Sequence, residues 1–305
     1  MMSRTVVMAS RQRSPGRLGR ERVLAWFASR SRSYPWRGSR DPYRVWVSEI
    51  MLQQTQAARV APAFDAFLRR FPTVTSLAAA SRREVLRAWD GLGYHRRAVA
   101  LSEASRVVVR DHDGELPADP VALRRLPGVG PYTSAAVASI AFGVPVAAVD
   151  TNVRRIVARV QFGVEADDAS PREVAGLANA WLDSRDPGRW NQALMDLGRE
   201  VCRPRPRCER CPLAADCRFL AAGLPLRPAR RRQGPFRGST REVRGAVVRA
   251  LRAHESLSVG RLVAETGFGT ERVVPAVSAL ADEGIVEAGP AALNGSPRGR
   301  VRLAV

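Results

Sequence analysis

Apolar residues recur at helical spacing through the first two thirds of the chain. One apolar face runs from Val23 to Phe27, and the same pattern returns in residues 57–71 and 85–109. Segments that alternate with a period of two are nearly absent there, and proline and glycine mark the short connections. We therefore expect residues 21–222 to form a mostly α region.

The end of the chain has a different pattern. Apolar positions predict one helix from Val243 to Leu251, a second that opens at Leu257-Ser258, and a third with Thr270 as its N-cap. Residues 285–288 and 300–303 alternate as in a short β-hairpin. Three helices and a hairpin are typical of a winged-helix domain, which either binds DNA or serves as a packing module.

The segment between these regions is rich in proline and glycine and carries the run Arg230-Arg231-Arg232, which indicates a linker. The first residues are basic and contain no acidic residue before Glu21. The expected segments are a basic disordered arm at 1–20, the helical region at 21–222, a linker at 223–240 and a winged-helix-like domain at 241–305.

The charge balance favours a polyanionic partner. The 305 residues carry a formal net charge of +20, and each phosphate that an arginine neutralises releases counterions. A solvated basic surface is the plainer alternative. All 49 basic residues are arginine, so no lysine side chain is present to form a Schiff base.

Membrane and export signals are weak. No apolar run approaches the roughly 18 residues of a membrane helix. The apolar stretch at residues 5–9 is too short for the core of a signal peptide. We expect a cytoplasmic, nucleoid-associated monomer with no membrane contact.

All four cysteines lie in one stretch and predict a metal site. The spacing is Cys202-x5-Cys208-x2-Cys211-x5-Cys217. Intracellular proteins rarely use such clusters as disulfides, so four thiolates could bind either zinc or a [4Fe–4S] cluster. A single CxxC pair with long outer spacings favours the iron–sulfur cluster.

Three further positions carry candidate chemistry. Gly128 and Gly130 precede an apolar helix, where backbone amides can approach an anion such as a DNA phosphate, although an ordinary turn would look the same. Asp150 precedes a helical segment and is by itself best explained as a cap. Glu49 lies in an apolar segment, where a carboxyl group is either paired or functional and is expected to have a raised pKa.

Taken together, these segments resemble the MutY-like adenine DNA glycosylases of the helix-hairpin-helix superfamily, over about residues 22–222. The motifs that carry the resemblance, in chain order, are residues 34–37 (YPWR), 48–56 (SEIMLQQTQ), 91–94 (GLGY), 126–130 (LPGVG), 149–155 (VDTNVRR) and the four-cysteine loop. The resemblance implies a six-helix barrel at about 37–147 and an iron–sulfur domain formed by 21–36 and 148–222.

The resemblance also implies roles for single residues. Glu49 is expected to protonate the leaving adenine, and Asp150 to stabilise the positive sugar. Tyr132 and Asn152 are expected to support them. Bifunctional relatives of the endonuclease III type use a lysine where this chain has Tyr132, so the expected enzyme is monofunctional.

The expected DNA contacts come from three segments. Gln53 and Tyr94 resemble residues that wedge into the duplex beside a flipped base, and Gln54 is a further expected DNA contact. Trp36 and Arg37 fall in the segment that approaches the adenine pocket. The cofactor implied is a [4Fe–4S] cluster held by the four cysteines, and the partner is double-stranded DNA with adenine opposite 8-oxoguanine or guanine.

The chain departs from the family pattern in three ways. Five residues rather than the usual six separate the first two cysteines, and Thr151 replaces the glycine that often follows the aspartate. The large β-rich domain that reads oxoguanine does not fit in the 65 residues of 241–305. A glycosylase for thymine or uracil opposite guanine, or a non-catalytic iron–sulfur DNA-binding protein, are therefore the alternatives.

Overall fold

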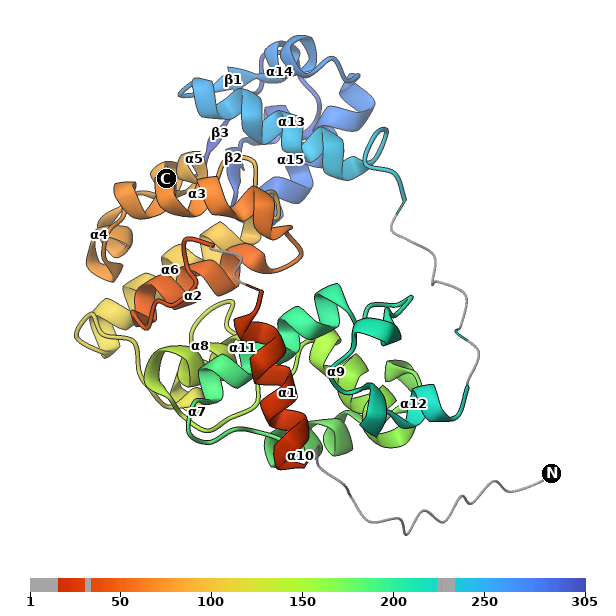
Figure 1. The fold of residues 1–305 in the computed structure, drawn as a ribbon. Coiled ribbons are helices and arrows are strands. Elements are labelled where there is room, and N and C mark those ends of the chain that lie inside the picture. The colour runs from red at the N-terminus through yellow and green to blue at the C-terminus, as the bar shows by residue number, and fades with distance from the viewer. Residues whose placement is uncertain (1–15, 31–33, 224–225, 227–233) are drawn as a thin grey trace, which may run out of the picture. The chain divides into compact units, whose positions relative to one another are not determined.

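The computed structural model describes residues 16–30, 34–223, 226 and 234–305 (Figure 1). The chain forms two compact units, one of residues 1–32 with 134–229 and one of residues 33–133 with 230–305. The predicted basic arm as far as residue 15 and the run Arg230–Arg232 lie outside the described residues. Among the residues that are described, no helix has the length and apolar character needed to cross a membrane.

The first unit is helical and contains the cysteine loop. Its helix α1 begins at Arg17, within the segment predicted to be a disordered arm. Its elements are α1 (Arg17–Ala28), most of α8 (Pro131–Phe142), α9 (Thr151–Val157), the π-helical turn η1 (Ala158–Phe162), η2 (Ala166–Asp168), α10 (Pro171–Ala180), α11 (Pro187–Glu200), η3 (Cys208–Arg210), η4 (Ala214–Asp216) and α12 (Arg218–Ala221).

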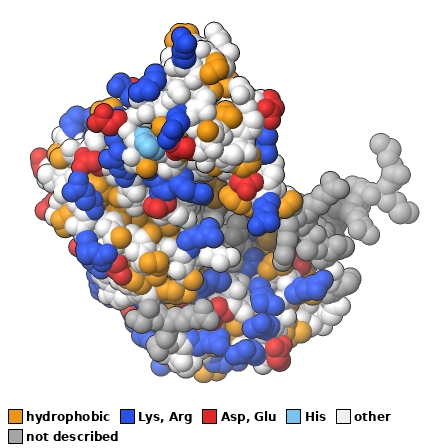
Figure 2. Space-filling view, turned by 90° about the horizontal axis from the view of Figure 1, so that it is seen from above, with side chains coloured by type: hydrophobic (Ala, Val, Ile, Leu, Met, Phe, Trp, Pro, Cys, Tyr) orange, Lys and Arg blue, Asp and Glu red, His pale blue; other side chains and the backbone are white. Residues whose placement is uncertain are grey.

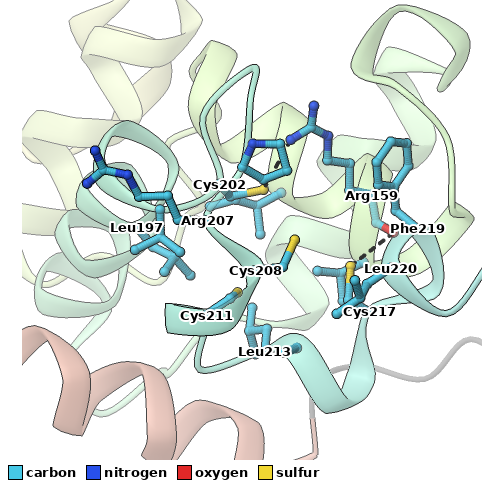
Figure 3. Close-up of a pocket in the computed structure, with 15 residues that line it drawn as sticks. Arg159, Leu197, Cys202, Arg207, Cys208, Cys211, Leu213, Cys217, Phe219 and Leu220 are labelled. Carbon is cyan, nitrogen blue, oxygen red and sulfur yellow. Dashed lines mark hydrogen bonds between the residues drawn. The ribbon is translucent and has the colours of Figure 1, made fainter. Parts of the chain in front are cut away.

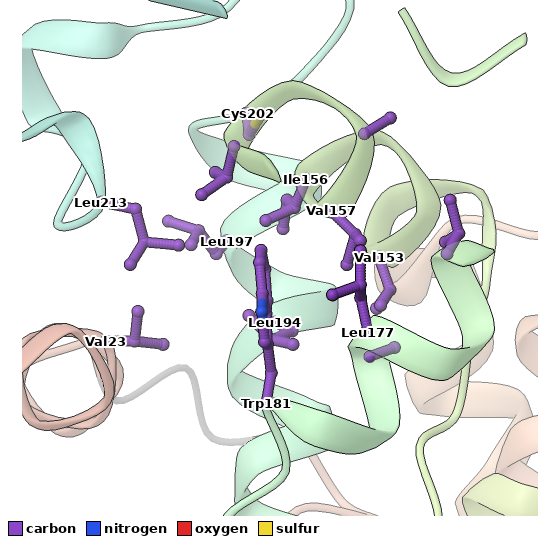
Figure 4. Packing of buried hydrophobic residues seen from close by; sticks show 14 of the residues in the cluster. Val23, Val153, Ile156, Val157, Leu177, Trp181, Leu194, Leu197, Cys202 and Leu213 are labelled. Carbon is purple, nitrogen blue, oxygen red and sulfur yellow. The ribbon is translucent and has the colours of Figure 1, made fainter. Parts of the chain in front are cut away.

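An apolar core connects these helices to the cysteine loop. Trp181 and Leu194 are buried between α9, α10 and α11, and Val23 of α1 packs into the same cluster (Figure 4). The cluster continues to Cys202 and Leu213 without a polar layer between. Burial of this continuous apolar surface therefore positions the cysteine loop on the helical core.

Local capping sets the N-termini of four of the helices at the beginning of the second unit. Asp41 and Asp119 accept hydrogen bonds from backbone amides of the helices that follow them, and Thr73 and Ser81 form capping boxes. The helices are α2 (Pro42–Leu52), α3 (Ala57–Arg70), α4 (Val74–Ala79), α5 (Arg82–Ala88), α6 (Arg96–Asp111) and α7 (Pro120–Leu123), followed by the start of α8.

The turn between α7 and α8 is the predicted hairpin. Gly128 has φ +74°, a conformation that side chains disfavour, and a Cβ at this position would lie 2.8 Å from the Cβ of Ala100. Any larger residue at position 128 would therefore have both an unfavourable backbone conformation and a steric clash with Ala100. The mostly helical, helix-hairpin-helix fold predicted from the sequence is confirmed.

The rest of the second unit is the C-terminal domain, which has the predicted three helices and a hairpin. Strands β2 and β3 pair antiparallel, and β1 adds to the other side of β3. The second helix opens at Leu257-Ser258 as predicted, because the Ser258 hydroxyl accepts a hydrogen bond from the amide of Arg261 and caps this helix, and the same two residues also pair with β3 as the short strand β1. One local prediction was wrong: the N-cap of the third helix is Gly269, not Thr270. The elements are α13 (Thr240–Ala253), β1 (Leu257–Ser258), α14 (Val259–Thr266), α15 (Thr270–Asp282), β2 (Val286–Ala288), α16 (Pro290–Leu293) and β3 (Arg300–Leu303).

Candidate active site and cysteine site

Helix α2 carries Glu49 in an almost fully buried environment. The helix begins at Pro42 behind the Asp41 cap, and every residue from Val45 to Met51 is buried. Glu49 itself is 7% exposed. A carboxyl group buried to this degree needs a polar partner, because leaving it unpaired costs several kcal/mol.

That partner is Tyr132, at the start of α8. The Tyr132 hydroxyl donates a hydrogen bond of 2.8 Å to Oε2 of Glu49. The hairpin with Gly128 and Gly130 directly precedes this helix, so its geometry sets where the tyrosine ring enters the site. The structure therefore brings together two of the residues predicted for the active site, from segments 83 positions apart in sequence.

The segment after α2 contains Gln53 and Gln54. Gln53 Nε2 donates a hydrogen bond of 3.2 Å to Oγ1 of Thr133, the neighbour of Tyr132. Gln54 is exposed and has φ 55°, in the left-handed region. Non-glycine residues adopt this conformation at a cost of the order of 1–3 kcal/mol and are concentrated at functional sites.

Tyr94, like Gln54, has a backbone conformation in the left-handed region. Its φ is 47° and its side chain is 43% exposed, which is high for a tyrosine. The loop before it includes two glycines with positive φ, Gly91 and Gly93. An exposed aromatic ring on a strained, glycine-rich loop fits the predicted wedge.

Arg97 connects the end of α2 to the Tyr94 loop. Its guanidinium donates to the carbonyl oxygens of Ile50 and Met51, both at 2.9 Å, and of Gln53. These carbonyls lie at the C-terminal end of a helix and have no partner within it. Burial lowers the pKa of Arg97 to about 10, which still leaves it charged at neutral pH.

The same side chain also holds the loop. Arg97 Nη2 donates to Leu92 O at 3.1 Å and to Gly93 O at 3.2 Å, and the guanidinium lies 5.3 Å from the ring centroid of Tyr94. No motif in the sequence marks Arg97. In a chain whose basic residues are all arginine, residue type alone does not distinguish a buried arginine from the many on the surface, which Figure 2 shows widely spread.

Asp150 caps α9 in the first unit, as predicted. Its Oδ1 accepts from the amides of Asn152 at 2.9 Å and Val153 at 2.7 Å, and its Oδ2 accepts from Nδ2 of Asn152 at 2.7 Å. Burial raises the pKa of Asp150, and these hydrogen bonds oppose the rise. The carboxylate is fixed in orientation by three donors from the start of one helix.

Arg155 extends this network toward the first cysteine. Its Nη2 donates to Oδ1 of Asn152 at 2.8 Å, and its Nε donates to the carbonyl oxygen of Cys202 at 2.5 Å. Helices α9 and α11 approach closely here, since a Cβ at Gly198 would lie 2.5 Å from the Cβ of Asn152. The sequence motif included Arg155, but the role of its side chain depends on α11, which the motif does not contain.

The four cysteines line one small apolar cavity (Figure 3). None is in a disulfide, and Cys202 is buried. Burial raises the pKa values of Cys202 and Cys208, and that of Cys211 to about 12. In the part of the chain that the structure describes, no group of three or more His, Cys, Asp or Glu side chains is placed closely enough to hold a single metal ion. Four thiols around one apolar cavity fit a cluster ligated by four cysteines, and the shortened first spacing still brings Cys202 and Cys208 to the same cavity.

Arg159 lies beside this cavity and is 2% exposed. It forms an ion pair of 2.9 Å with Glu165 and donates to Arg203 O at 2.9 Å. Its Nη1 lies 3.8 Å from the sulfur of Cys202, and its guanidinium lies 4.9 Å from the ring centroid of Phe219 (Figure 3). A buried cation therefore faces the thiol sulfur on the side of the cavity formed by η1.

Trp36 and Arg37 lie in a turn before α2. Trp36 is 6% exposed, stacks on Tyr34 with ring centroids 5.0 Å apart, and meets the edge of Phe64. Arg37 is partly buried, and its amide donates to Tyr34 O at 2.8 Å. Trp36 is thus a packing residue of this turn, while Arg37 remains partly accessible.

The chain matches known proteins over most of this region. Residues 47–182 match the model of the HhH-GPD superfamily base excision DNA repair proteins. The adenine DNA glycosylase of Mycolicibacterium smegmatis is 41% identical over 232 residues, covering 75% of this chain and 79% of the relative. The human adenine DNA glycosylase is 43% identical over 209 residues, covering 64% of this chain and 38% of the human protein.

Solved structures of DNA repair enzymes are also similar to this chain. A thermostable thymine-DNA glycosylase has a TM-score of 0.62 and 31% identity, covering 67% of this chain and 95% of that chain. Endonuclease III in a non-covalent DNA complex has a TM-score of 0.57 and 25% identity, covering 67% of this chain and 94% of that chain. Fold and site together define a DNA glycosylase of the helix-hairpin-helix class. Within that class, the chain belongs to the MutY-like adenine DNA glycosylase family.

Proposed function

We propose that this protein is a monofunctional glycosylase that removes adenine paired with 8-oxoguanine or guanine in double-stranded DNA. The observation that carries the proposal is the hydrogen bond between Tyr132 and the buried Glu49. It supplies a carboxyl group in an apolar site, next to a phenol at the position where bifunctional relatives have a lysine. A lysine-dependent lyase step has no candidate side chain in this sequence.

In the proposed reaction, Glu49 donates a proton to the leaving adenine as the bond between the base and deoxyribose breaks. Water adds its hydroxyl group to the sugar carbon, and its proton returns to a carboxylate of the site. The transition state resembles an oxocarbenium ion. The negative charge of Asp150, oriented by Asn152 and the start of α9, stabilises this cation.

DNA binding is assigned to exposed and partly buried residues of the second unit. Tyr94, Gln53 and Gln54 are proposed to occupy the space left when adenine leaves the base stack. The hairpin amides at Gly128 and Gly130 are proposed to contact a backbone phosphate. The net charge of +20 supports a phosphate-dominated contribution to affinity. We expect the protein to act as a monomer on the nucleoid in the cytoplasm.

We also propose that Cys202, Cys208, Cys211 and Cys217 hold a [4Fe–4S] cluster. When bound, it would cross-link the loop from residue 202 to 217 and add folding free energy to this region. Arg159 would place a positive charge beside one ligand, and the apolar wall would keep water from the site.

A second base specificity is favoured by one feature of the sequence and one comparison. Thr151 follows Asp150 where a glycine is frequent in the adenine enzymes, and a thymine-DNA glycosylase is among the similar structures. The same two carboxyl groups would serve removal of thymine or uracil opposite guanine.

One product assay distinguishes these functions. The protein is incubated in excess over duplexes that differ only in one pair: A·8-oxoguanine, A·G, T·G and U·G. The matched inactive control is Glu49→Gln. Release of adenine from the first two duplexes supports the proposed function. Release of thymine or uracil alone would instead support the pyrimidine specificity. If no base is released while the DNA is bound, the protein is a non-catalytic DNA-binding protein.

A further inference from the structure

The C-terminal domain, residues 240–305, packs against the helical part of its own unit. Arg82 of α5 donates from Nη1 to Gly284 O at 3.0 Å and from Nη2 to Glu103 of α6 at 3.0 Å. Strand β3 lies alongside α5 (Figure 1). One arginine thus connects the turn before β2 with the two helices that border the Tyr94 loop.

A second contact lies at the beginning of that loop. Arg252 of α13 forms an ion pair with Asp90, and the Arg252 side chain is only 16% exposed. Asp90 is followed by Gly91 and Gly93, with φ of 73° and 65°. Glycines in this conformation give the loop freedom that other residues would not. The ion pair at Asp90 therefore restricts the beginning of the loop, in addition to the contacts of Arg97 with Leu92 and Gly93.

A third contact lies at the end of the loop. His95 directly follows Tyr94 and is mostly buried. The charged groups that face its imidazole are Arg252 and Arg244 of α13, Arg97 of its own helix, and Asp90. Burial and then these arginines lower the pKa of His95 to about 4, so the ring is neutral at neutral pH. Helix α13 thus faces residues on both sides of Gly91–Tyr94.

Helix α15 occupies the position of the helix that reads DNA in helix-turn-helix proteins, but its composition does not suit that task. Its single basic residue is Arg272, which donates to Gly238 O at 2.9 Å and lies over the ring of Phe268. The helix also carries two acidic residues, Glu271 and Asp282, and a proline at residue 275. Of the two interpretations of this domain, the observations favour packing over DNA reading.

We propose that the C-terminal domain is an intramolecular brace that positions the Tyr94 loop, with Asp90 and Arg252 as positioning residues. The proposal rests on the proposed function only in assigning Tyr94 to insertion into DNA. The domain holds the loop in the conformation required for insertion before DNA binds. The entropy cost of ordering a glycine-rich loop is then not part of the free energy of DNA binding.

Charge-swap variants of the full-length protein test the brace. The two single variants are Asp90→Arg and Arg252→Asp, and the double variant carries both substitutions. The matched control is Arg249→Asp, which makes the same charge change on an exposed residue of the same helix. Hydrogen exchange of residues 91–95 is measured without DNA. Single-turnover adenine release and affinity for A·8-oxoguanine duplex follow. Thermal melting verifies that each variant is folded, and a second pair with the same charges, Asp90→Lys with Arg252→Glu, replaces any that is not.

Each single variant should accelerate exchange at residues 91–95 about fivefold and slow base release by a similar factor, because an ion pair with one solvent-exposed partner contributes up to about 1 kcal/mol. The double should return both values to within about twofold of wild type, and Arg249→Asp should leave the exchange unchanged. Unchanged exchange in both singles overturns the brace. Equal loss of DNA affinity in Arg252→Asp and Arg249→Asp, without rescue in the double, also overturns it and indicates phosphate binding. If the wild type releases no adenine, the proposed function fails, and the exchange data still decide the brace.

Discussion

Tyr132 and Glu49 share a hydrogen bond of 2.8 Å between a phenol and a carboxyl group that is 7% exposed. The phenol can orient the carboxyl group and can also stabilise its charged form after a proton has left. A lysine at the same position would instead place an amine beside Glu49. The identity of residue 132 therefore bears directly on which reactions the site can perform.

The first prediction concerns strand cleavage. Because Tyr132 replaces the amine and the sequence contains no lysine, borohydride should trap little or no covalent protein–DNA adduct during turnover. Strands should break only after alkali or heat treatment. Efficient β-elimination at neutral pH by the wild type would contradict this prediction. Endonuclease III, treated in parallel, provides the positive control for trapping.

The second prediction concerns the cysteine site. Protein purified without oxygen should be yellow-brown and contain about four iron atoms per chain, as a [4Fe–4S] cluster held by four cysteine thiolates requires. Cys208→Ser should lower both iron content and thermal stability, because a bound structural metal centre adds folding free energy. Stoichiometric zinc without iron would show that the four thiols bind zinc instead.

The third prediction concerns Arg97. Arg97→Met should lower the free energy of unfolding by about 3 kcal/mol, because buried carbonyl oxygens at the end of α2 and in the Tyr94 loop lose their donor. Arg96→Met is the matched control, since the exposed Arg96 should change stability by no more than about 0.5 kcal/mol. Urea unfolding measures both. Equal losses of unfolding free energy in Arg97→Met and Arg96→Met would show that the hydrogen bonds of Arg97 do not stabilise the fold.

The fourth prediction concerns pH. The folded protein holds the pKa of His95 at about 4, below its ordinary value of 6.5, so the unfolded chain binds a proton first as the pH falls. The neutral ring therefore contributes stability above pH 6.5, and this contribution is lost as the pH falls toward 4. His95→Gln should show a shallower loss of melting temperature between about pH 7 and pH 5 than the wild type. Identical pH profiles would mean that His95 titrates normally in the folded protein.

Local sequence signals predicted the parts of the site that depend on near neighbours. Asp150 caps α9 as expected, because its side chain accepts from amides two and three residues later. The four cysteines gather as expected, because they lie within one short loop. The β2–β3 hairpin follows from alternation along two short segments. In each case the partners are either close in sequence or of a type with few alternatives.

Contacts between distant segments escaped prediction. The short segment at Leu257-Ser258 is a strand only because the distant strand β3 supplies its partner. Arg97 and Arg155 donate hydrogen bonds to carbonyl groups on other helices, and nothing in the composition of their own helices separates them from surface arginines. Trp36 lies in the segment expected to approach the adenine pocket, and its packing against Phe64 is a contact that the sequence pattern does not reveal.

The most direct test of the proposed chemistry is single-turnover adenine release by Glu49→Gln on an A·8-oxoguanine duplex, beside its affinity for the same DNA. Glutamine keeps the shape of Glu49 and can still accept the hydrogen bond from Tyr132, but it cannot donate a proton as an acid. The account predicts a loss of about 10²–10⁴ in rate, the usual contribution of general acid catalysis, with nearly unchanged affinity. Wild-type rates in this variant would contradict the account.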